Sequence, residues 1–340
     1  MDANNARIAV ITDAWHPQTN GVVRTLNTTR SMLLSQGHQV QVIEPGMCHS
    51  FPCPTYPEIR LAWRPKKLVN TQLEIFKPQA VHIATEGPLG MAARSWCLTR
   101  GLPYTTSYHT QFPEYLRARL PVPLSFSYTW LRHFHGKAAR TMVATPSMQT
   151  QLESHGFQHL VRWSRGVDVQ LFRPRNEVAL DLPRPIAVYL GRVAVEKNIE
   201  EFLKLDLPGT KLVIGDGPAR VALQSKYPDV KFVGYKFGEE LAAHMAACDV
   251  MVFPSRTDTF GLVLLEAMAC GVSVAAYPVT GPIDVVREGV TGVLSNDLQA
   301  ATIAALKMDR TACRDHALKY TWEHATAQFF TNLAQIEAHL

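Results

Sequence analysis

The segment PSRTDTFGLVLLEAMACG, residues 254–271, carries the strongest signal in this chain of 340 residues. It follows an apolar run, VMVF, that has the length and composition of a buried strand. Turn residues come next, and the following apolar stretch predicts a helix that begins near Phe260 and Gly261. Two acids, Asp258 and Glu266, stand eight positions apart and would lie on roughly the same side of this unit. The segment therefore predicts a binding site at the end of a strand.

A helix start of this kind favours an anionic ligand. Its unpaired N–H groups attract phosphate, and Gly261 lets a ligand approach the backbone. A carboxylate buried beside a phosphate is costly unless it accepts hydrogen bonds, which sugar hydroxyls can donate. Glu266 could then hold a ribose and Asp258 a transferred sugar. Taken alone, the segment fits equally well a helix capped by Asp258 and Thr259, with Glu266 on the surface.

The alternation of strand and helix patterns along the chain predicts an α/β fold. Apolar runs that end in turn residues alternate with helical stretches, which indicates parallel sheets covered on both faces. This alternation occurs once in each half of the chain, which predicts two Rossmann-like domains that face a central cleft. We expect strands at RIAVIT, GHQVQVIEP, KPQAVHIAT, LPYTTSYHT and ARTMVATPS in the first half, and at PIAVYLG, TKLVIGDGP, VKFVGY, CDVMVFPS and GVSVAAY in the second.

A proline-rich, weakly periodic stretch at residues 167–185 predicts the linker between the domains. The first domain is expected at residues 1–170 and the second at 171–324. A C-terminal amphipathic helix at about 325–340 is expected to cross back and brace the first domain.

Composition limits the classes of function. The hydrophobic share of 46% suits packed cores, and no apolar stretch approaches the ~20 residues that span a membrane. The opening residues MDANNARIAV lack the basic region of a signal peptide, so we expect a cytoplasmic protein. Six scattered cysteines are expected to be free thiols, and thirteen histidines show no metal-ligand spacing, so no metal is expected.

Charge is distributed unevenly along the chain. Residues 1–175 hold 19 Lys/Arg and 9 Asp/Glu, a net of +10, whereas the remainder holds 15 and 20, a net of −5. A basic first half suggests an anionic lipid, nucleic acid or a phosphorylated substrate. No basic helix or aromatic–basic motif of a nucleic-acid module occurs, so no nucleic-acid partner is expected.

The segment FGLVLLEAMACG resembles the E-x7-E signature of the retaining glycosyltransferases of family 4, which have the GT-B fold. The first acid is Asp258 where the family more often has Glu. GRVAVEKN resembles the family's G-R-x4-K motif, and GDGP its glycine turn below the nucleotide. TNGVVRTL resembles the family's phosphate- or acceptor-facing loop, and SYHTQFPEYL the segment with a histidine beside the transferred sugar.

The resemblance implies a nucleoside diphosphate sugar as donor and front-face transfer with retention, in which the departing phosphate serves as base. Fixed cations replace a metal, and no cofactor is implied. The catalytic residues implied are His109, Arg192, Lys197 and Asp258. The donor-binding residues implied are Gly21, Gly215, Asp216, Gly217, Phe260, Gly261, Leu262 and Glu266. Without the resemblance, Arg192 and Lys197 would be interpreted as a solvated surface pair and His109 as a structural histidine.

TEGPLG, YHTQFPEY and SRTDTFG most resemble the branch of the family that glycosylates membrane lipids such as diacylglycerol. Residues 111–121 combine aromatic, apolar and basic side chains and predict contact with an anionic membrane. For the helix from Leu124 to Phe134 a core position is favoured, with most of its apolar side chains on one face. The predicted enzyme is thus a hexosyltransferase that lies peripherally on the inner face of the membrane.

The sequence is also compatible with other functions. The acceptor could instead be a polysaccharide or an isoprenoid-linked oligosaccharide, as for a mannosyltransferase. No residue pattern separates UDP from GDP, although a UDP-sugar is favoured over a GDP-sugar. An NAD-dependent oxidoreductase is disfavoured because the first strand leads into TDAWHPQTNG rather than GxGxxG. Asp258 in place of Glu keeps open a sugar-nucleotide sensor or scaffold without catalysis.

Overall fold

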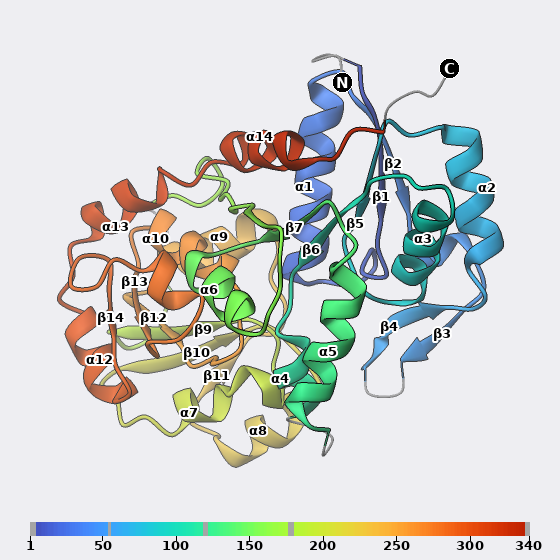
Figure 1. Ribbon diagram of the computed structural model, residues 1–340. Coiled ribbons are helices and arrows are strands. Elements are labelled where there is room, and N and C mark those ends of the chain that lie inside the picture. Colours follow the sequence, from blue (N-terminus) through green and yellow to red (C-terminus); the bar gives the residue numbers. More distant parts are fainter. Residues whose placement is uncertain (1–4, 54–55, 118–121, 176–179, 337–340) are drawn as a thin grey trace. The chain divides into compact units, whose positions relative to one another are not determined.

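The computed structural model describes residues 5–53, 56–117, 122–175 and 180–336. It divides the chain into unit 1, Met1–Ser164 with Trp322–Leu340, and unit 2, Arg165–Thr321. Each unit contains a six-stranded parallel sheet with helices on both faces (Figure 1). The prediction of an α/β protein with two Rossmann-like halves is confirmed.

The sheet of unit 1 has the strand order β2-β1-β5-β6-β7-β8. Its strands are β1 (Arg7–Ile11), β2 (Gln39–Ile43), β5 (Ala80–Ile83), β6 (Thr105–Tyr108), β7 (Arg140–Val143) and β8 (Leu160–Arg162). A separate antiparallel hairpin joins β3 (Ser50–Cys53) and β4 (Tyr56–Ala62). The helices are α1 (Gly21–Ser35), η1 (Pro45–Met47), α2 (Lys66–Phe76), α3 (Pro88–Thr99), α4 (Phe112–Arg117), α5 (Leu124–His135), α6 (Pro146–Ser154) and α14 (Trp322–Asn332).

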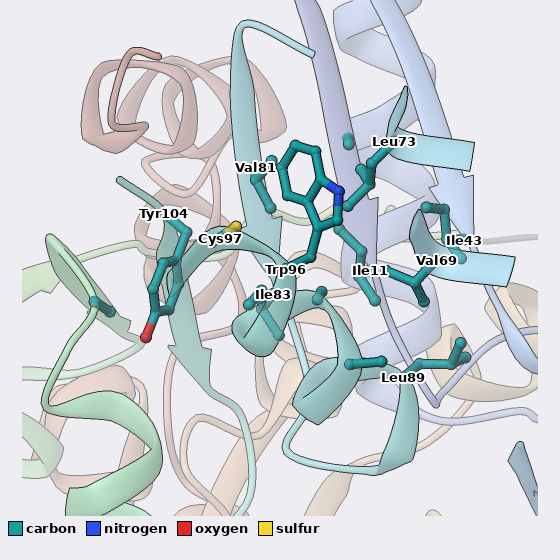
Figure 2. Packing of buried hydrophobic residues seen from close by; sticks show 14 of the residues in the cluster. Ile11, Ile43, Val69, Leu73, Val81, Ile83, Leu89, Trp96, Cys97 and Tyr104 are labelled. Carbon is teal, nitrogen blue, oxygen red and sulfur yellow. The ribbon is translucent and has the colours of Figure 1, made fainter. Parts of the chain in front are cut away.

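Strand β1 is buried on both sides, because its successive side chains point to opposite faces of the sheet. Ile11 packs with residues of α2 and α3, among them Val69 and Trp96 (Figure 2). On the other face, Ile8 packs in a cluster that includes Leu26 of α1 and residues of α14. A continuous apolar strand such as RIAVI is therefore expected at the centre of a covered parallel sheet.

Helix α14 packs within unit 1 although it lies near the end of the chain. Phe329 is 1% exposed and its ring lies 4.7 Å from that of Trp163. The Thr326 hydroxyl donates to the sulfur of Met32 in α1, at 3.4 Å. The helix ends at Asn332, so the expected helix of residues 325–340 begins three residues earlier and is shorter; residues 337–340 lie outside the described part.

The sheet of unit 2 has the strand order β11-β10-β9-β12-β13-β14. Its strands are β9 (Ile186–Leu190), β10 (Thr210–Ile214), β11 (Lys231–Phe232), β12 (Val250–Phe253), β13 (Ser273–Ala276) and β14 (Gly292–Leu294). Its helices are η2 (Val195–Lys197), α7 (Ile199–Leu203), α8 (Arg220–Lys226), α9 (Gly238–Ala246), α10 (Leu262–Ala269), α11 (Pro282–Val285), α12 (Leu298–Ala305) and α13 (Arg310–Ala317).

The strand order fixes where each unit can bind a ligand. In unit 2 the chain builds the sheet outward from β9 in one direction and then restarts beside β9 with β12, so these two strands flank the switch point. In unit 1 the corresponding pair is β1 and β5. Ligands of open α/β sheets bind beyond the carboxyl ends of the strands at such a point. The loops after β9 and β12 are therefore the first place to look in unit 2.

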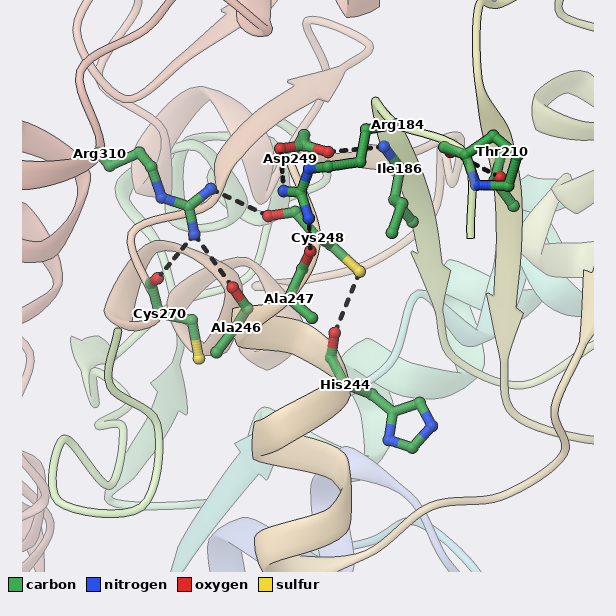
Figure 3. A network of polar contacts seen from close by, with 11 residues as sticks. Arg184, Ile186, Thr210, His244, Ala246, Ala247, Cys248, Asp249, Cys270 and Arg310 are labelled. Carbon is green, nitrogen blue, oxygen red and sulfur yellow. Dashed lines mark hydrogen bonds and ion pairs between the residues drawn. The ribbon is translucent and has the colours of Figure 1, made fainter. Parts of the chain in front are cut away.

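The Arg310 side chain binds the C-terminal ends of α9 and α10 in unit 2. Arg310 donates to the carbonyl oxygens of Ala246 and Cys248 after α9, and of Cys270 after α10 (Figure 3). Guanidinium groups suit these positions because helix C-terminal carbonyls lack intrahelical partners. Helix α10 is thus held at its C-terminal end, which leaves its N-terminal end at the switch-point loops.

The expected linker is partly packed rather than free. Arg314 of α13 donates to the carbonyl oxygens of Val169 and Phe172, and the Phe172 side chain is 1% exposed. The first part of residues 167–185 therefore belongs to the body of unit 2, while residues 176–179 lie outside the described part.

None of the helices in the described ranges combines the length and apolar character that crossing a bilayer requires.

Candidate functional site

Three side-chain contacts join the two loops that flank the unit 2 switch point. The loop after β9 includes the 3₁₀ turn η2, and the loop after β12 leads into α10. The contacts are Lys197 Nζ to Asp258 Oδ1 at 2.6 Å, Asn198 Nδ2 to the Pro254 carbonyl at 3.1 Å, and Thr257 Oγ1 to the Glu196 carbonyl at 3.3 Å. Residues 196–198 and 254–258, far apart in sequence, thus form one polar surface at the strand ends.

Both predicted cations face acids. Arg192 lies 3.7 Å from Glu196, whose side chain is only 3% exposed. Lys197 pairs with Asp258, and the side chains of Arg192 and Lys197 are 26% and 21% exposed. The alternative of a solvated surface pair is therefore wrong. The two cations are half-buried at the switch point, where a positive charge acts more strongly than in bulk water.

Asp258 has one oxygen engaged and one in need of a donor. Oδ1 accepts from Lys197, whereas Oδ2 is buried without a hydrogen-bond partner. Buried polar atoms in folded proteins almost always have a partner, so Oδ2 is suited to accept a hydrogen bond from a ligand or a water molecule. The helix-cap alternative is wrong, because the N-cap of α10 is Gly261 and no side chain caps that helix.

The start of α10 is built for close approach of a ligand. Gly261 has a φ of 83°, a left-handed conformation that favours glycine. Phe260 is buried and Leu262 begins the helix, so the uncapped first turn follows directly. Glu266 lies in the second turn and is 2% exposed, so the alternative of a surface Glu266 is also wrong. A carboxylate buried in an apolar helix requires polar contacts.

The glycine turn after β10 packs against the loop after β9. A Cβ at Gly215 would lie 1.9 Å from the carbonyl oxygen of Gly191, so only glycine fits there. The carboxylate of Asp216 accepts from the Gly217 N–H at 2.7 Å and pairs with Arg220 at 2.5 Å. Residues 215–217 therefore lie against the loop after β9, and the Asp216 side chain is engaged by Gly217 and by Arg220 at the start of α8.

Ser255 is a polar residue of the site that the sequence interpretation missed. It is the second residue after β12 and is 2% exposed, and its hydroxyl is buried without a hydrogen-bond partner. It lies between Pro254 and Thr257, which both contact the loop after β9. The signal available was its position in PSRTD, directly after the strand that carries the acid motif.

In unit 1, the two predicted residues lie at strand and helix ends. Gly21 is the exposed first residue of α1, whose N–H groups at Val22 and Val23 are capped by the Asn20 side chain at 3.0 Å. That cap satisfies the donors that a phosphate would otherwise use. His109 directly follows β6 and is half-buried, and its ring lies edge-on to Trp163 at 5.5 Å.

A buried carboxyl at the unit 1 switch point was also missed. Asp13 follows β1 and accepts from the Thr85 hydroxyl at 2.9 Å and from the Leu89 N–H at 3.0 Å, at the start of α3. Burial raises the pKa of Asp13 to about 6, and the hydrogen bonds from Leu89 and Thr85 oppose that rise. Asp13 thus ties the loop after β1 to the loop after β5.

The two halves of the chain match two models of glycosyltransferase domains. The model described as Glycosyltransferase Family 4 matches residues 19–171, and the model described as Glycosyl transferases group 1 matches residues 184–308. A GDP-mannose-dependent alpha-mannosyltransferase of Mycobacterium tuberculosis (strain CDC 1551 / Oshkosh) is 31% identical over 314 residues, covering 85% of this chain and 83% of that protein. The chain belongs to glycosyltransferase family 4.

Further relatives agree with this assignment. Sulfoquinovosyl transferase SQD2 of Arabidopsis thaliana is 30% identical over 317 residues, which cover 82% of this glycosyltransferase and 61% of SQD2. Among solved structures, sucrose-phosphate synthase from Thermosynechococcus elongatus superposes with a TM-score of 0.76 at 20% identity, covering 96% of this chain and 98% of that one. The structural likeness confirms the GT-B fold. The chain is a glycosyltransferase that takes its sugar from a nucleotide sugar.

The described residues contain neither a disulfide nor a cluster of metal ligands. None of the six cysteines forms a disulfide, and burial raises the pKa of Cys97, Cys248 and Cys270 to about 12, which keeps these thiols protonated. In the described ranges, no group of three or more His, Cys, Asp or Glu side chains is placed to hold a metal ion.

Proposed function

We propose that this glycosyltransferase moves a hexose, with retention of configuration, from a nucleoside diphosphate sugar to a membrane lipid such as diacylglycerol. The observation that carries the donor half of this proposal is the arrangement at the unit 2 switch point. Two half-buried cations and an uncapped helix start lie beside an acid whose second oxygen lacks a donor. Cations suit a diphosphate, and the acid suits a sugar hydroxyl.

Arg192 and Lys197 would neutralise the diphosphate and stabilise it as it leaves. The first turn of α10, at Phe260 to Leu262, adds backbone N–H donors aimed at the same charge. Fixed positive groups that need no reorganisation stabilise a developing negative charge strongly. We propose that transfer proceeds on one face of the sugar without a metal ion, because these groups supply the charge that a metal would supply.

Two acids would hold the two sugars of the donor. We propose that Glu266, buried in α10, accepts from the ribose and that Asp258 Oδ2 accepts from a hydroxyl of the transferred sugar. A sugar hydroxyl would then supply the donor that the buried Asp258 Oδ2 requires. His109 of unit 1 is proposed to lie beside the transferred sugar, and Gly21 to face the donor phosphates or the acceptor; both assignments rest on the family resemblance.

The lipid acceptor is supported by an aromatic surface on unit 1, which we call the α4–α5 patch. Phe112, Phe126 and Trp130 are 43%, 69% and 37% exposed, and the rings of Phe112 and Trp130 lie 6.3 Å apart. The apolar side chains of α5 therefore do not share one buried face, since Phe126 and Trp130 turn outward while Leu131 and Phe134 are buried. Exposed aromatics on a basic domain suit an anionic membrane surface.

The patch shares Phe112 with the predicted membrane contact at residues 111–121, whereas Phe126 and Trp130 belong to α5, for which the sequence favoured a core position. Of the expected contact residues 111–121, residues 118–121 lie outside the described part. Arg117 and Arg132, at the ends of α4 and α5, are exposed on the same two helices. Their charge adds to the net +10 of residues 1–175.

A second candidate is a GDP-mannose-dependent mannosyltransferase that acts on a polysaccharide or an isoprenoid-linked oligosaccharide. The observation in its favour is the name of three relatives, all GDP-mannose-dependent alpha-mannosyltransferases. They are 30–31% identical to this chain, and each match covers 85% of this chain and 76–84% of the relative. Our preference for a UDP-sugar therefore has to be tested directly against GDP-mannose.

The test is a two-step assay with the purified full-length protein. A panel of UDP- and GDP-sugars is first ranked by thermal shift, and the best donors are then offered with diacylglycerol in detergent or with an isoprenoid-linked oligosaccharide. A glycosylated diacylglycerol supports the lipid proposal. Transfer only to the oligosaccharide supports the second candidate, and release of no nucleotide from any donor would overturn both.

A further inference from the structure

The ion pair between Lys197 and Asp258 has a consequence for the order of binding and release. Without a ligand, the ammonium that would hold the donor diphosphate is 2.6 Å from the carboxylate that would hold the transferred sugar. Both side chains are about one fifth exposed, so each is held where solvent replaces a lost partner poorly. A diphosphate that binds Lys197 must compete with Asp258 for it.

We propose that Lys197 and Asp258 exchange partners when the donor binds and rejoin when the sugar has left. A nucleotide sugar offers both replacements, since its diphosphate takes Lys197 and a sugar hydroxyl donates to Asp258. The nucleoside diphosphate product offers only the first, and it leaves the carboxylate beside a negative ligand with no donor. The pair therefore weakens binding of the product relative to the substrate and speeds release. This inference rests on the proposed function.

Oδ2 of Asp258 makes the exchange favourable for the substrate. That oxygen is buried and accepts from no donor of the protein, so a sugar hydroxyl would supply a donor that the protein itself does not. Oδ1 loses Lys197 in the same event. Donation to a carboxylate is among the stronger hydrogen bonds in proteins, which lets a hydroxyl compensate for part of the lost ion pair.

Dissociation constants of the nucleoside diphosphate and of the intact nucleotide sugar test the proposal. They are measured by ligand-observed NMR, which also reaches weak binding, for the wild type, Asp258→Asn, Lys197→Met and the double variant. Asp258→Asn should lower the dissociation constant of the nucleoside diphosphate by about three- to tenfold, where tenfold corresponds to 1.4 kcal/mol. The same variant should raise the dissociation constant of the nucleotide sugar. In the Lys197→Met background the same substitution should tighten the diphosphate less than about twofold, as expected for coupled partners.

Asp249→Asn is the matched control. Asp249 precedes β12 as Asp258 follows it, its side chain is 22% exposed against 20%, and it forms an ion pair with Arg184 at the opposite end of the strand. This variant should leave both dissociation constants unchanged. The control shows whether removing the charge of another half-buried carboxylate has the same effect as removing that of Asp258.

Two results would overturn the exchange. Equal tightening of the diphosphate with and without Lys197 would show that Asp258 only repels the ligand. Unchanged affinity for both ligands in Asp258→Asn would show that the pair does not compete with either. In both cases a wild type that still turns over a nucleotide sugar leaves the proposed function standing, whereas a wild type that binds no nucleotide sugar contradicts the proposed function itself.

Discussion

Lys197 Nζ and Asp258 Oδ1 lie 2.6 Å apart, and this contact joins the two loops at the switch point of the unit 2 sheet. It means that each member of the pair has a structural partner before any ligand arrives. Variants of either residue therefore change both the free protein and the complex. Predictions for this pair have to compare ligands, not only activities.

Removal of either cation should lower catalytic efficiency. Arg192→Ala or Lys197→Ala loses a charge-assisted bond to the diphosphate, which costs about 1.5–3 kcal/mol. That corresponds to a fall in kcat/KM of roughly ten- to a hundredfold or more, measured by initial rates with the best donor. Wild-type turnover in both variants would show that the phosphate site lies elsewhere.

The two acids should affect different kinetic constants. Asp258→Asn keeps the shape but removes charge near the reacting sugar, so kcat should fall most. Glu266→Gln weakens a ribose contact made in both ground and transition states, so the KM for the donor should rise. Steady-state kinetics separate the two. A fully active Asp258→Asn with unchanged donor preference would place the sugar elsewhere.

Asp258→Glu tests whether the pocket fits the shorter acid. The longer side chain has to move either its own carboxylate or the Lys197 ammonium from their present contact. We expect lower activity than the wild type, although Glu is the more usual residue of the family. An activity above that of the wild type would show that the pocket tolerates either length.

Activity should survive chelation. In the proposed mechanism Arg192, Lys197 and the start of α10 meet the charge on the leaving diphosphate, so we expect no divalent ion to be required. Rates measured before and after dialysis against EDTA should agree. A loss restored only by magnesium or manganese would contradict this prediction.

Asp13 should make stability depend on pH. Its pKa of about 6 lies above its ordinary value of 3.8, so the folded state binds the proton more tightly than the unfolded state. The resulting stability is fully present below pH 3.8 and is lost as pH rises through about 6. Relative to Asp13→Asn, the wild type should lose roughly 2 kcal/mol of unfolding free energy between pH 4 and 7. Urea unfolding at both pH values measures this; a constant difference would contradict it.

Binding to anionic vesicles should depend on salt and on the α4–α5 patch. Each basic residue near an anionic surface contributes about 1 kcal/mol, and salt screens this attraction. Sedimentation with vesicles should be strong at low salt and weaker in Phe126→Ser and Trp130→Ser. Ile75→Ser is the control, because Ile75 is 73% exposed on α2, away from the patch. Equal binding to neutral vesicles would instead indicate apolar insertion.

Much of the fold could be predicted because buried parallel strands are continuous apolar runs. All ten strands expected from such runs are present. The hairpin of β3 and β4 was missed because Pro52 and Pro57 argue against strands. The edge strands β8 and β14 were missed because each is only three residues long and carries little pattern.

The positions of Arg192 and Asp258 in the loops that follow β9 and β12 could be predicted because both strands are clear apolar runs in the sequence. Their roles stay predictions. Contacts between distant loops could not be predicted from the sequence. The ion pair of Lys197 with Asp258 depends on strand order, because β9 and β12 become neighbours only in the folded sheet. Ser255 and Asp13 were missed for a related reason. Their importance comes from burial and hydrogen bonding, which no local spacing reveals.

Hydrogen–deuterium exchange, with and without the donor that gives the largest thermal shift, tests the central claim most directly. The account predicts slower exchange on donor binding in residues 191–198, 215–219 and 255–266, with little change around Asp249 at the opposite end of β12. Protection confined to other segments, or none at a saturating donor concentration, would contradict a nucleotide-sugar site at the switch point between β9 and β12.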